Sequence, residues 1–228
     1  NKTGLKTIAI HHGKSYADET GCVMPPIFAT STFEHGNKAN FDYTRSGNPN
    51  FSILENVLKG IENSNYCTVF NSGISAVTAI VSSLKSGDKI LCESNLYGCT
   101  IRMFEKIFRK FGIQTSYFDF TNKEYIQQIS KVKPSLIWLE SPTNPLLKIL
   151  NLKEICSEAN SRKIPVVVDN TFCTAVIQRP LELGATLSLI STTKFINGHS
   201  DALGGAVITN DESWNNKMIF SQKSLGLN

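Results

Sequence analysis

The chain has 228 residues, of which 41% are hydrophobic and 18% are charged, so it can bury a sizeable core and is neither disordered nor fibrous. It carries 23 Lys and Arg against 19 Asp and Glu, and these charges are scattered along the sequence. The densest basic stretch, EKIFRKFG at 105–112, has helical spacing and two phenylalanines. We interpret it as a solvated helix face, and we expect no nucleic-acid partner.

Two further classes of protein are excluded by pattern. No stretch reaches the roughly 18 consecutive apolar residues of a membrane span, and the N-terminal stretch NKTGLKTIAIHHG lacks the apolar core of a signal peptide. The cysteines form no C-x-x-C pair, and several lie in or beside apolar runs. We therefore expect reduced thiols in a soluble, cytoplasmic protein. The chain does not begin with Met and stops at KSLGLN after a helix-like stretch, which suggests an excerpt or a truncated product.

The elements expected along the chain fall into two parts. Residues 1–50 show little periodicity and contain a Pro-Pro pair and a run of turn formers, so we predict an extended arm. From residue 51 helical and strand-like patterns alternate. Helices are predicted at 51–62, 72–87, 99–111, 122–131 and 152–162, and strands at 66–70, 89–93, 114–120, 135–140, 165–170, 186–190 and 205–209.

Strands that are apolar on both faces and joined by helices indicate a sheet covered on each side. The sequence therefore predicts a three-layer α/β/α domain over 51–228 with a mostly parallel sheet. In such sheets ligands collect at the carboxyl ends of the strands, where helix N-termini also present free amides. Polar residues follow the strands at 71–73, 93–97, 140–144, 169–171 and 191–194.

One lysine stands out at these strand ends. Lys194, in STTKFINGHSD, follows an apolar run, and a lysine in an apolar setting loses its proton readily and becomes a nucleophile toward aldehydes. A surface lysine in a loop is the alternative. Asp169 closes the VVVD strand, where a buried carboxylate is costly unless a cation pairs with it, although it could instead cap the turn that follows.

Nearby groups are suited to an anion and to a planar ring. Ser72 and Gly73 open a helix after a strand, and the hydroxyls of Ser191 and Thr193 lie on one side of an extended chain. Tyr97 could stack on a flat molecule or pack in the core. An amine, an acid for a ring nitrogen and donors for a phosphate are the requirements of pyridoxal phosphate.

Two other sites are not supported by spacing. Gly13-Lys14-Ser15 resembles the end of a P-loop, but the first glycine of that motif would fall at Ile8. The histidines at 11, 12 and 199, with Asp201, have no spacing that places ligands on one face, and we expect no metal. A generic nucleotide-binding α/β protein also lacks its glycine fingerprint here.

The motifs from about residue 5 to the last residue match one family in order. They are IHHG, TGCVMPPIFATSTF, YTRSGNPN, NSG, LYGCT, ESPTNPLLKI, VVVDNTF, PLELGA and STTKFINGHSD. The chain resembles the Cys/Met-metabolism, or trans-sulfuration, family of pyridoxal-phosphate enzymes. The resemblance implies fold type I, the aspartate aminotransferase-like fold, with residues 51–228 as its large cofactor domain.

The resemblance also implies roles for particular residues. Lys194 would bind the cofactor aldehyde and move protons, Asp169 would pair with the pyridine nitrogen, and Tyr97 would stack on the ring. Tyr97 and Lys194 are thus the expected catalytic residues. The cofactor phosphate would be surrounded by Ser72, Gly73, Ile74, Ser191 and Thr193 from one subunit, with Tyr43 and Arg45 from its neighbour. Glu140, Asn144 and Thr171 would line the cofactor, and Tyr43 and Arg102 the substrate.

The reaction type stays open within the family. TGCVMPPI and NGHSD resemble the γ-synthase and γ-lyase of cystathionine, whereas Tyr97-Gly98-Cys99-Thr100 resembles methionine γ-lyase. We expect γ-replacement that forms cystathionine from an activated homoserine and cysteine, with γ-elimination as the alternative. Family members continue into a smaller C-terminal domain that this sequence does not include, so a pyridoxal-phosphate-binding domain with little activity of its own is a further alternative. The resemblance implies a homo-oligomer with shared sites, expected to be a tetramer.

Overall fold

The structure, a computed structural model, describes residues 4–13 and 21–228. Seven strands form one sheet within these residues, and each lies at a position that the sequence predicts. They are β1 (Tyr66–Phe70), β2 (Lys89–Glu93), β3 (Gln114–Phe118), β4 (Leu136–Glu140), β5 (Val166–Asp169), β6 (Leu187–Ile190) and β7 (Gly205–Thr209).

The strand order is β1-β7-β6-β5-β4-β2-β3, and only β7 runs against the others. The pairs β2–β3, β2–β4, β4–β5 and β5–β6 are parallel. The prediction of a mostly parallel sheet is therefore confirmed. Because β2, β4, β5 and β6 are parallel neighbours, their carboxyl ends meet at one edge of the sheet.

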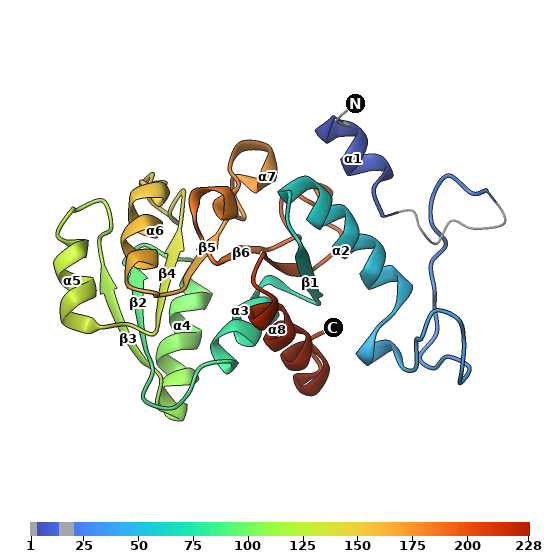
Figure 1. Cartoon of the computed structure of the whole chain (residues 1–228), viewed down its shortest axis with the longest axis horizontal. Coiled ribbons are helices and arrows are strands. Elements are labelled where there is room, and N and C mark those ends of the chain that lie inside the picture. Colours follow the sequence, from blue (N-terminus) through green and yellow to red (C-terminus); the bar gives the residue numbers. More distant parts are fainter. Residues whose placement is uncertain (1–3, 14–20) are drawn as a thin grey trace.

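Helices cover both faces of this sheet (Figure 1). The apolar side chains of α3, α4 and α8 pack against one face, and those of α2, α5 and α6 pack against the other. This confirms the three-layer α/β/α arrangement. The helices are α2 (Pro49–Glu62), α3 (Gly73–Ser82), α4 (Gly98–Lys106), α5 (Tyr125–Val132), α6 (Leu152–Ser161) and α8 (Glu212–Leu225).

Local signals explain where these helices begin and end. Asn48 caps α2 with its side chain, and Pro49 takes the first helical position, where its missing amide costs nothing. Ser72 caps α3 in the same way. The helix predicted at 99–111 is divided into α4 and a short 3-10 helix, Phe108–Phe111, which ends at Gly112 with φ +84°. Only the outer boundaries of that prediction are confirmed.

The helices α1 and α7 were not predicted from the sequence, because neither is long enough to show a helical period. The helix α1 (Leu5–His11) lies in the arm and packs against α2, where a Cβ added at Gly60 would be 2.8 Å from Ile8 Cγ2. The single turn α7 (Thr174–Ile177) follows β5. Among residues 4–13 and 21–228, the other 3-10 turns are Thr44–Ser46 and Pro180–Leu183. Between residues 21 and 48 the arm is otherwise largely irregular and runs away from the sheet (Figure 1).

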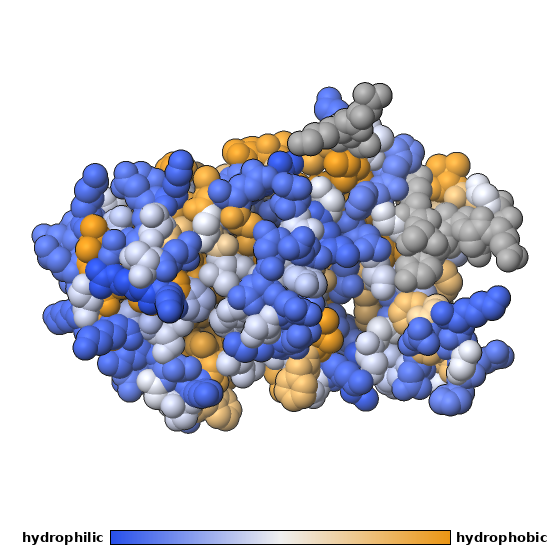
Figure 2. Space-filling model, viewed as in Figure 1, coloured by the Kyte–Doolittle hydropathy of each residue, from blue (hydrophilic) through white to orange (hydrophobic). Residues whose placement is uncertain are grey.

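The core lies on both sides of the central strands. Trp138 on β4 is fully buried and meets the ring of Phe104 on α4 edge-on, with 5.2 Å between ring centroids. On the surface, apolar side chains gather over α7, where Val176 and Ile177 are exposed (Figure 2). The packed central strands give the strand ends a rigid base.

Ile129→Ala should lower the free energy of unfolding by about 2–5 kcal/mol, because it leaves a cavity between α5 and the sheet. Ile129 is 1% exposed, whereas Ile126 on the same helix is 41% exposed. Ile126→Ala is the matched control, and we expect a change below about 1 kcal/mol. Denaturant unfolding of both variants measures the difference, and equal losses would contradict the packing described for α5.

Candidate active site

Three buried carboxylates end three strands of the sheet. Glu93, Glu140 and Asp169 are the last residues of β2, β4 and β5, and they are 0%, 5% and 9% exposed. β4 lies between the other two strands, and Glu140 pairs in register with Asp169. A buried carboxylate is costly unless donors or a cation lie beside it, so the partners of these groups define the site.

Asp169 is held by the turn that follows β5. Its Oδ1 accepts hydrogen bonds from the Thr171 amide, at 3.0 Å, and from the Thr171 hydroxyl, at 2.5 Å. Burial raises the pKa of Asp169, and these two bonds oppose the rise. The carboxylate therefore caps the turn, as the alternative interpretation of the sequence expects. A cation beside it would also offset the cost of its burial.

Thr171 links Asp169 to the segment that carries the lysine. Its Oγ1 accepts the amide of Ser191 at 2.9 Å while donating to Asp169. Ser191 in turn lies against the start of α3, because a Cβ added at Gly73 would be 2.8 Å from the Cβ of Ser191. Glycine at position 73 permits this approach. The ends of β5 and β6 and the start of α3 thus meet at one point.

The start of α3 is suited to an anion. The first amides of a helix lack intrahelical acceptors and carry the positive end of the helix dipole. Ser72 accepts one backbone amide of the first turn at 3.1 Å. The hydroxyl of Thr193, which was expected beside Ser191 at the phosphate, instead accepts the amide of Gly204 at 3.0 Å and donates to the carbonyl of Gly204 at 3.2 Å. The structure brings Ser72, Gly73 and Ser191 together, while the hydroxyl of Thr193 is bonded to Gly204.

Lys194 lies in the turn that follows β6 and is exposed. Its amide donates to the carbonyl of Ser191 at 3.3 Å, and its carbonyl accepts the amide of Gly198 at 2.8 Å. The expected apolar setting is therefore not present around the lysine within this chain. The reason is that β6 ends at Ile190, and the turn carries Lys194 beyond the buried strand.

Tyr97 immediately precedes α4 and is 44% exposed, so the alternative of a core tyrosine is wrong. Its backbone amide donates to Glu140 Oε2 at 2.7 Å. Arg102, one turn along α4, is exposed, and its Nη1 lies 3.6 Å from Cys99 Sγ. An aromatic face, a thiol and a guanidinium therefore stand close together at the start of this helix.

Two other residues expected near the cofactor, Asn144 and Ile74, are placed as follows. Asn144 is half-buried in the loop after β4. The side chain of Ile74 packs against the hydrophobic core, so only its backbone is available to an anion.

Tyr43 and Arg45 lie beside and within the 3-10 turn Thr44–Ser46, in contact with α8. The Nη1 of Arg45 donates to the carbonyl of Lys223 on α8 at 3.0 Å, and its guanidinium carbon lies 5.4 Å from the centroid of the Tyr43 ring. Asn228 donates to the carbonyl of Arg45 at 2.7 Å. In this chain the two residues thus belong to a corner formed by the arm and the end of α8.

Glu93 begins one of the polar segments noted in the sequence analysis, which gave it no role of its own. Its carboxylate accepts the amides of Asn95 and Phe120, both at 2.9 Å, and the hydroxyl of Ser94. These bonds hold the segment that leads to Tyr97. An acidic residue at the end of an apolar strand is the sequence signal that identifies it, the same signal that pointed to Asp169.

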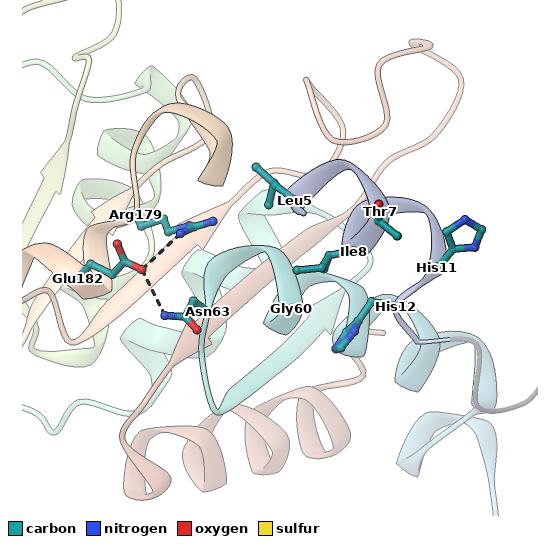
Figure 3. A pocket seen from close by; sticks show the side chains of 9 residues that line it. All are labelled: Leu5, Thr7, Ile8, His11, His12, Gly60, Asn63, Arg179 and Glu182. Atoms are coloured by element: carbon teal, nitrogen blue, oxygen red, sulfur yellow. Dashed lines mark hydrogen bonds and ion pairs between the residues drawn. The ribbon is translucent and has the colours of Figure 1, made fainter. Parts of the chain in front are cut away.

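A cavity of about 730 Å³ lies elsewhere, between α1, α2 and the turn at 180–183. Figure 3 shows Asn63 and Arg179 directed toward Glu182, with bonds of 3.3 and 3.4 Å. None of the candidate site residues lines it. Within residues 4–13 and 21–228 no cluster of three or more His, Cys, Asp or Glu side chains could hold a metal ion.

The strand-end residues fit pyridoxal phosphate. Asp169 is a buried carboxylate that a protonated ring nitrogen would neutralise, and Tyr97 offers an exposed ring. The start of α3 against Ser191 offers amides and a hydroxyl to a phosphate. A family model for Cys/Met metabolism PLP-dependent enzymes matches residues 6–228. The chain belongs to this family. The prediction of its cofactor and of fold type I is confirmed.

Individual members of the Cys/Met-metabolism family are similar over nearly the whole chain. A probable cystathionine gamma-synthase of Herpetosiphon aurantiacus is 38% identical over 226 residues, covering 98% of this chain and 71% of that protein. Cystathionine gamma-lyase of Homo sapiens is 39% identical over 226 residues, covering 96% of this chain and 56% of that enzyme.

A solved structure of the same family has the same fold over the length of this chain. Cystathionine gamma synthase from Xanthomonas oryzae pv. oryzae, in complex with aminoacrylate and cysteine, matches with a TM-score of 0.94 at 34% identity. The match covers 100% of this chain and 60% of that one. The chain therefore spans little more than half the length of several relatives. Among the helices that the structure describes, none is long and apolar enough to cross a membrane.

Glu140 should make the stability of the cofactor-free chain depend on pH. Burial, and then the charge of Asp169, raises the pKa of Glu140 from 4.5 to about 8. The folded chain keeps the proton of Glu140 at pH values where the unfolded chain has lost it. The contribution of protonated Glu140 to the stability of the fold is therefore complete below about pH 4.5 and is lost as the pH rises toward 8. Glu140→Gln removes this dependence.

Between pH 5 and pH 8 we therefore expect the free energy of unfolding of Glu140→Gln to rise by at least about 1 kcal/mol relative to that of the wild type. Urea unfolding at several pH values measures the gain. Parallel stability curves for the two proteins would show that Glu140 is not a buried acid with a raised pKa.

Proposed function

We propose that this chain is the cofactor-binding part of a cytoplasmic enzyme that joins an activated homoserine to cysteine by γ-replacement, forming cystathionine. The observation that supports it best is the hydrogen-bonded chain from Asp169 through Thr171 to Ser191, which ends against Gly73 at the start of α3. It connects a partner for a ring nitrogen with an anion site. Relatives named cystathionine gamma-synthase add support.

Each residue then has a physical task. When bound, pyridoxal phosphate supplies an electron sink for the carbanion formed at the substrate α-carbon. Asp169 holds the proton of the ring nitrogen, and the start of α3 with Ser191 holds the phosphate. The amine of Lys194 takes and returns protons at the substrate α- and β-carbons, and the ring of Tyr97 covers the cofactor plane. Arg102 orients the substrate near Tyr97.

Elimination is the second candidate function. It is favoured by Cys99, whose sulfur lies 3.6 Å from Arg102 and which follows Tyr97 closely, and by relatives named cystathionine gamma-lyase and beta-lyase. A thiol at this point would influence how the γ-substituent leaves the bound substrate.

The assembly is part of the proposal. We infer that residues 1–50 act as an arm that completes the site of a neighbouring subunit, with Tyr43 and Arg45 reaching the phosphate there, in a homotetramer that binds a small amino-acid substrate. Residues 51–228 form the cofactor domain. In its own chain the guanidinium of Arg45 is bonded to the carbonyl of Lys223 on α8. A guanidinium suits a phosphate through its paired donors.

Lys194→Ala should abolish covalent attachment of the cofactor, because the reacting amine is lost while the turn's backbone bonds are kept. The measurement is the mass of the chain after incubation with pyridoxal phosphate and reduction with borohydride, with Lys217→Ala on α8 as the control. We expect a single adduct for the wild type and the control and none for Lys194→Ala. An adduct of equal yield on the variant would assign the reaction to another amine.

Mixing Arg45→Ala chains with Lys194→Ala chains should restore activity, because a hybrid dimer contains one site with both residues intact. Random pairing of equal amounts predicts about a quarter of the wild-type activity per dimer. The measurement is cystathionine formation by the full-length protein before and after subunit exchange, with each variant alone as control. Persistent inactivity despite demonstrated exchange would contradict the sharing of sites.

A further inference from the structure

The end of β4 and the start of α4 are joined by one hydrogen bond. The backbone amide of Tyr97 donates to Glu140 Oε2 at 2.7 Å. Glu140 is 5% exposed, and every residue of β4 is buried between β2 and β5. The acceptor therefore lies at the end of a fully buried strand inside the sheet.

The other bonds of Tyr97 are made within its own helix. Its carbonyl accepts the amides of Thr100 and Ile101, and its side chain is hydrogen-bonded to that of Cys99. The residue is 44% exposed. Glu93 holds the preceding Asn95 by its amide, and the Ser94 amide donates to the carbonyl of Phe118 at 2.9 Å. The beginning of the segment 94–97 is thus attached to β2 and β3, and its end is attached to β4 through Glu140.

A packing role does not explain an acid at position 140. Burial and the neighbouring Asp169 both raise the pKa of Glu140, so the carboxyl group is a cost to the fold that an apolar side chain of similar size would avoid. What an apolar side chain cannot do is accept the amide of Tyr97. A backbone amide at the start of a helix has no intrahelical acceptor, and leaving it unpaired is unfavourable.

We propose that Glu140 is a positioning residue that accepts the backbone amide of Tyr97 and thereby sets the place of the Tyr97 ring over the cofactor. This deepens the proposed function and rests on it, because it assumes that the ring of Tyr97 covers pyridoxal phosphate. Glu140 acts through Tyr97 in this scheme and needs no contact with the cofactor.

The test compares two neutral replacements of similar length. Glu140→Gln keeps an oxygen acceptor and Glu140→Met removes it, so their difference isolates the hydrogen bond from the loss of the acid beside Asp169. Each is made in the wild type and in Tyr97→Ala, and the dissociation constant of pyridoxal phosphate is measured by absorbance titration. We expect Glu140→Met to bind about tenfold more weakly than Glu140→Gln, the scale of one hydrogen bond.

In the Tyr97→Ala background the same two variants should differ by less than about twofold, because the group through which Glu140 acts is gone. Amide exchange of the cofactor-free chain gives a second measurement. Exchange over 94–97 should be faster in Glu140→Met than in Glu140→Gln, with thermal unfolding of both as the control for folding.

The outcomes separate this inference from the proposed function. An undiminished difference in the Tyr97→Ala background, or Gln and Met variants that bind equally, would overturn the role of Glu140. A wild-type chain that binds no pyridoxal phosphate would overturn the proposed function. The exchange measurement would still decide whether Glu140 holds Tyr97, since it uses no cofactor.

Discussion

Two carboxylates lie side by side at the ends of adjacent parallel strands, and the arrangement of the site follows from the cost of burying them together. Parallel strands are about 4.8 Å apart, and Glu140 and Asp169 are in register. Burial raises the pKa of both. Such a pair requires donors, a proton or a cation. Thr171 and the amide of Tyr97 supply the donors, and a protonated cofactor ring would supply the cation.

The same requirement ties together segments that are far apart in the sequence. The hydroxyl of Thr171 both donates to Asp169 and accepts from Ser191, so the carboxylate at the end of β5 fixes the start of the lysine turn. The close approach of Gly73 then brings the amides of α3 to that turn. The proposed partner of the ring nitrogen and the proposed anion site are thus held at a set separation by backbone and short side chains, without a long flexible residue between them.

Much of this could be predicted from the sequence, because buried parallel strands have apolar runs and their polar residues fall at the carboxyl ends. What the pattern could not reveal is strand order, so the contact of Tyr97 with Glu140, which depends on β2 lying next to β4, was not foreseen. The reversed direction of β7 was also hidden. The segment between β6 and β7 is an irregular turn with no crossover helix, and an antiparallel return suits it.

The exposure of the lysine has the most direct bearing on how the chain works. Lys194, Tyr97 and Arg102 are all exposed, whereas chemistry that develops a carbanion benefits from the exclusion of water. The sheet domain of this chain leaves these three side chains uncovered. Tyr43 and Arg45 lie beside and within the 3-10 turn Thr44–Ser46, which is bonded to Lys223 on α8 and to Asn228. An open surface of this kind needs a covering element, and in the proposed assembly the arm of a neighbouring subunit would supply it.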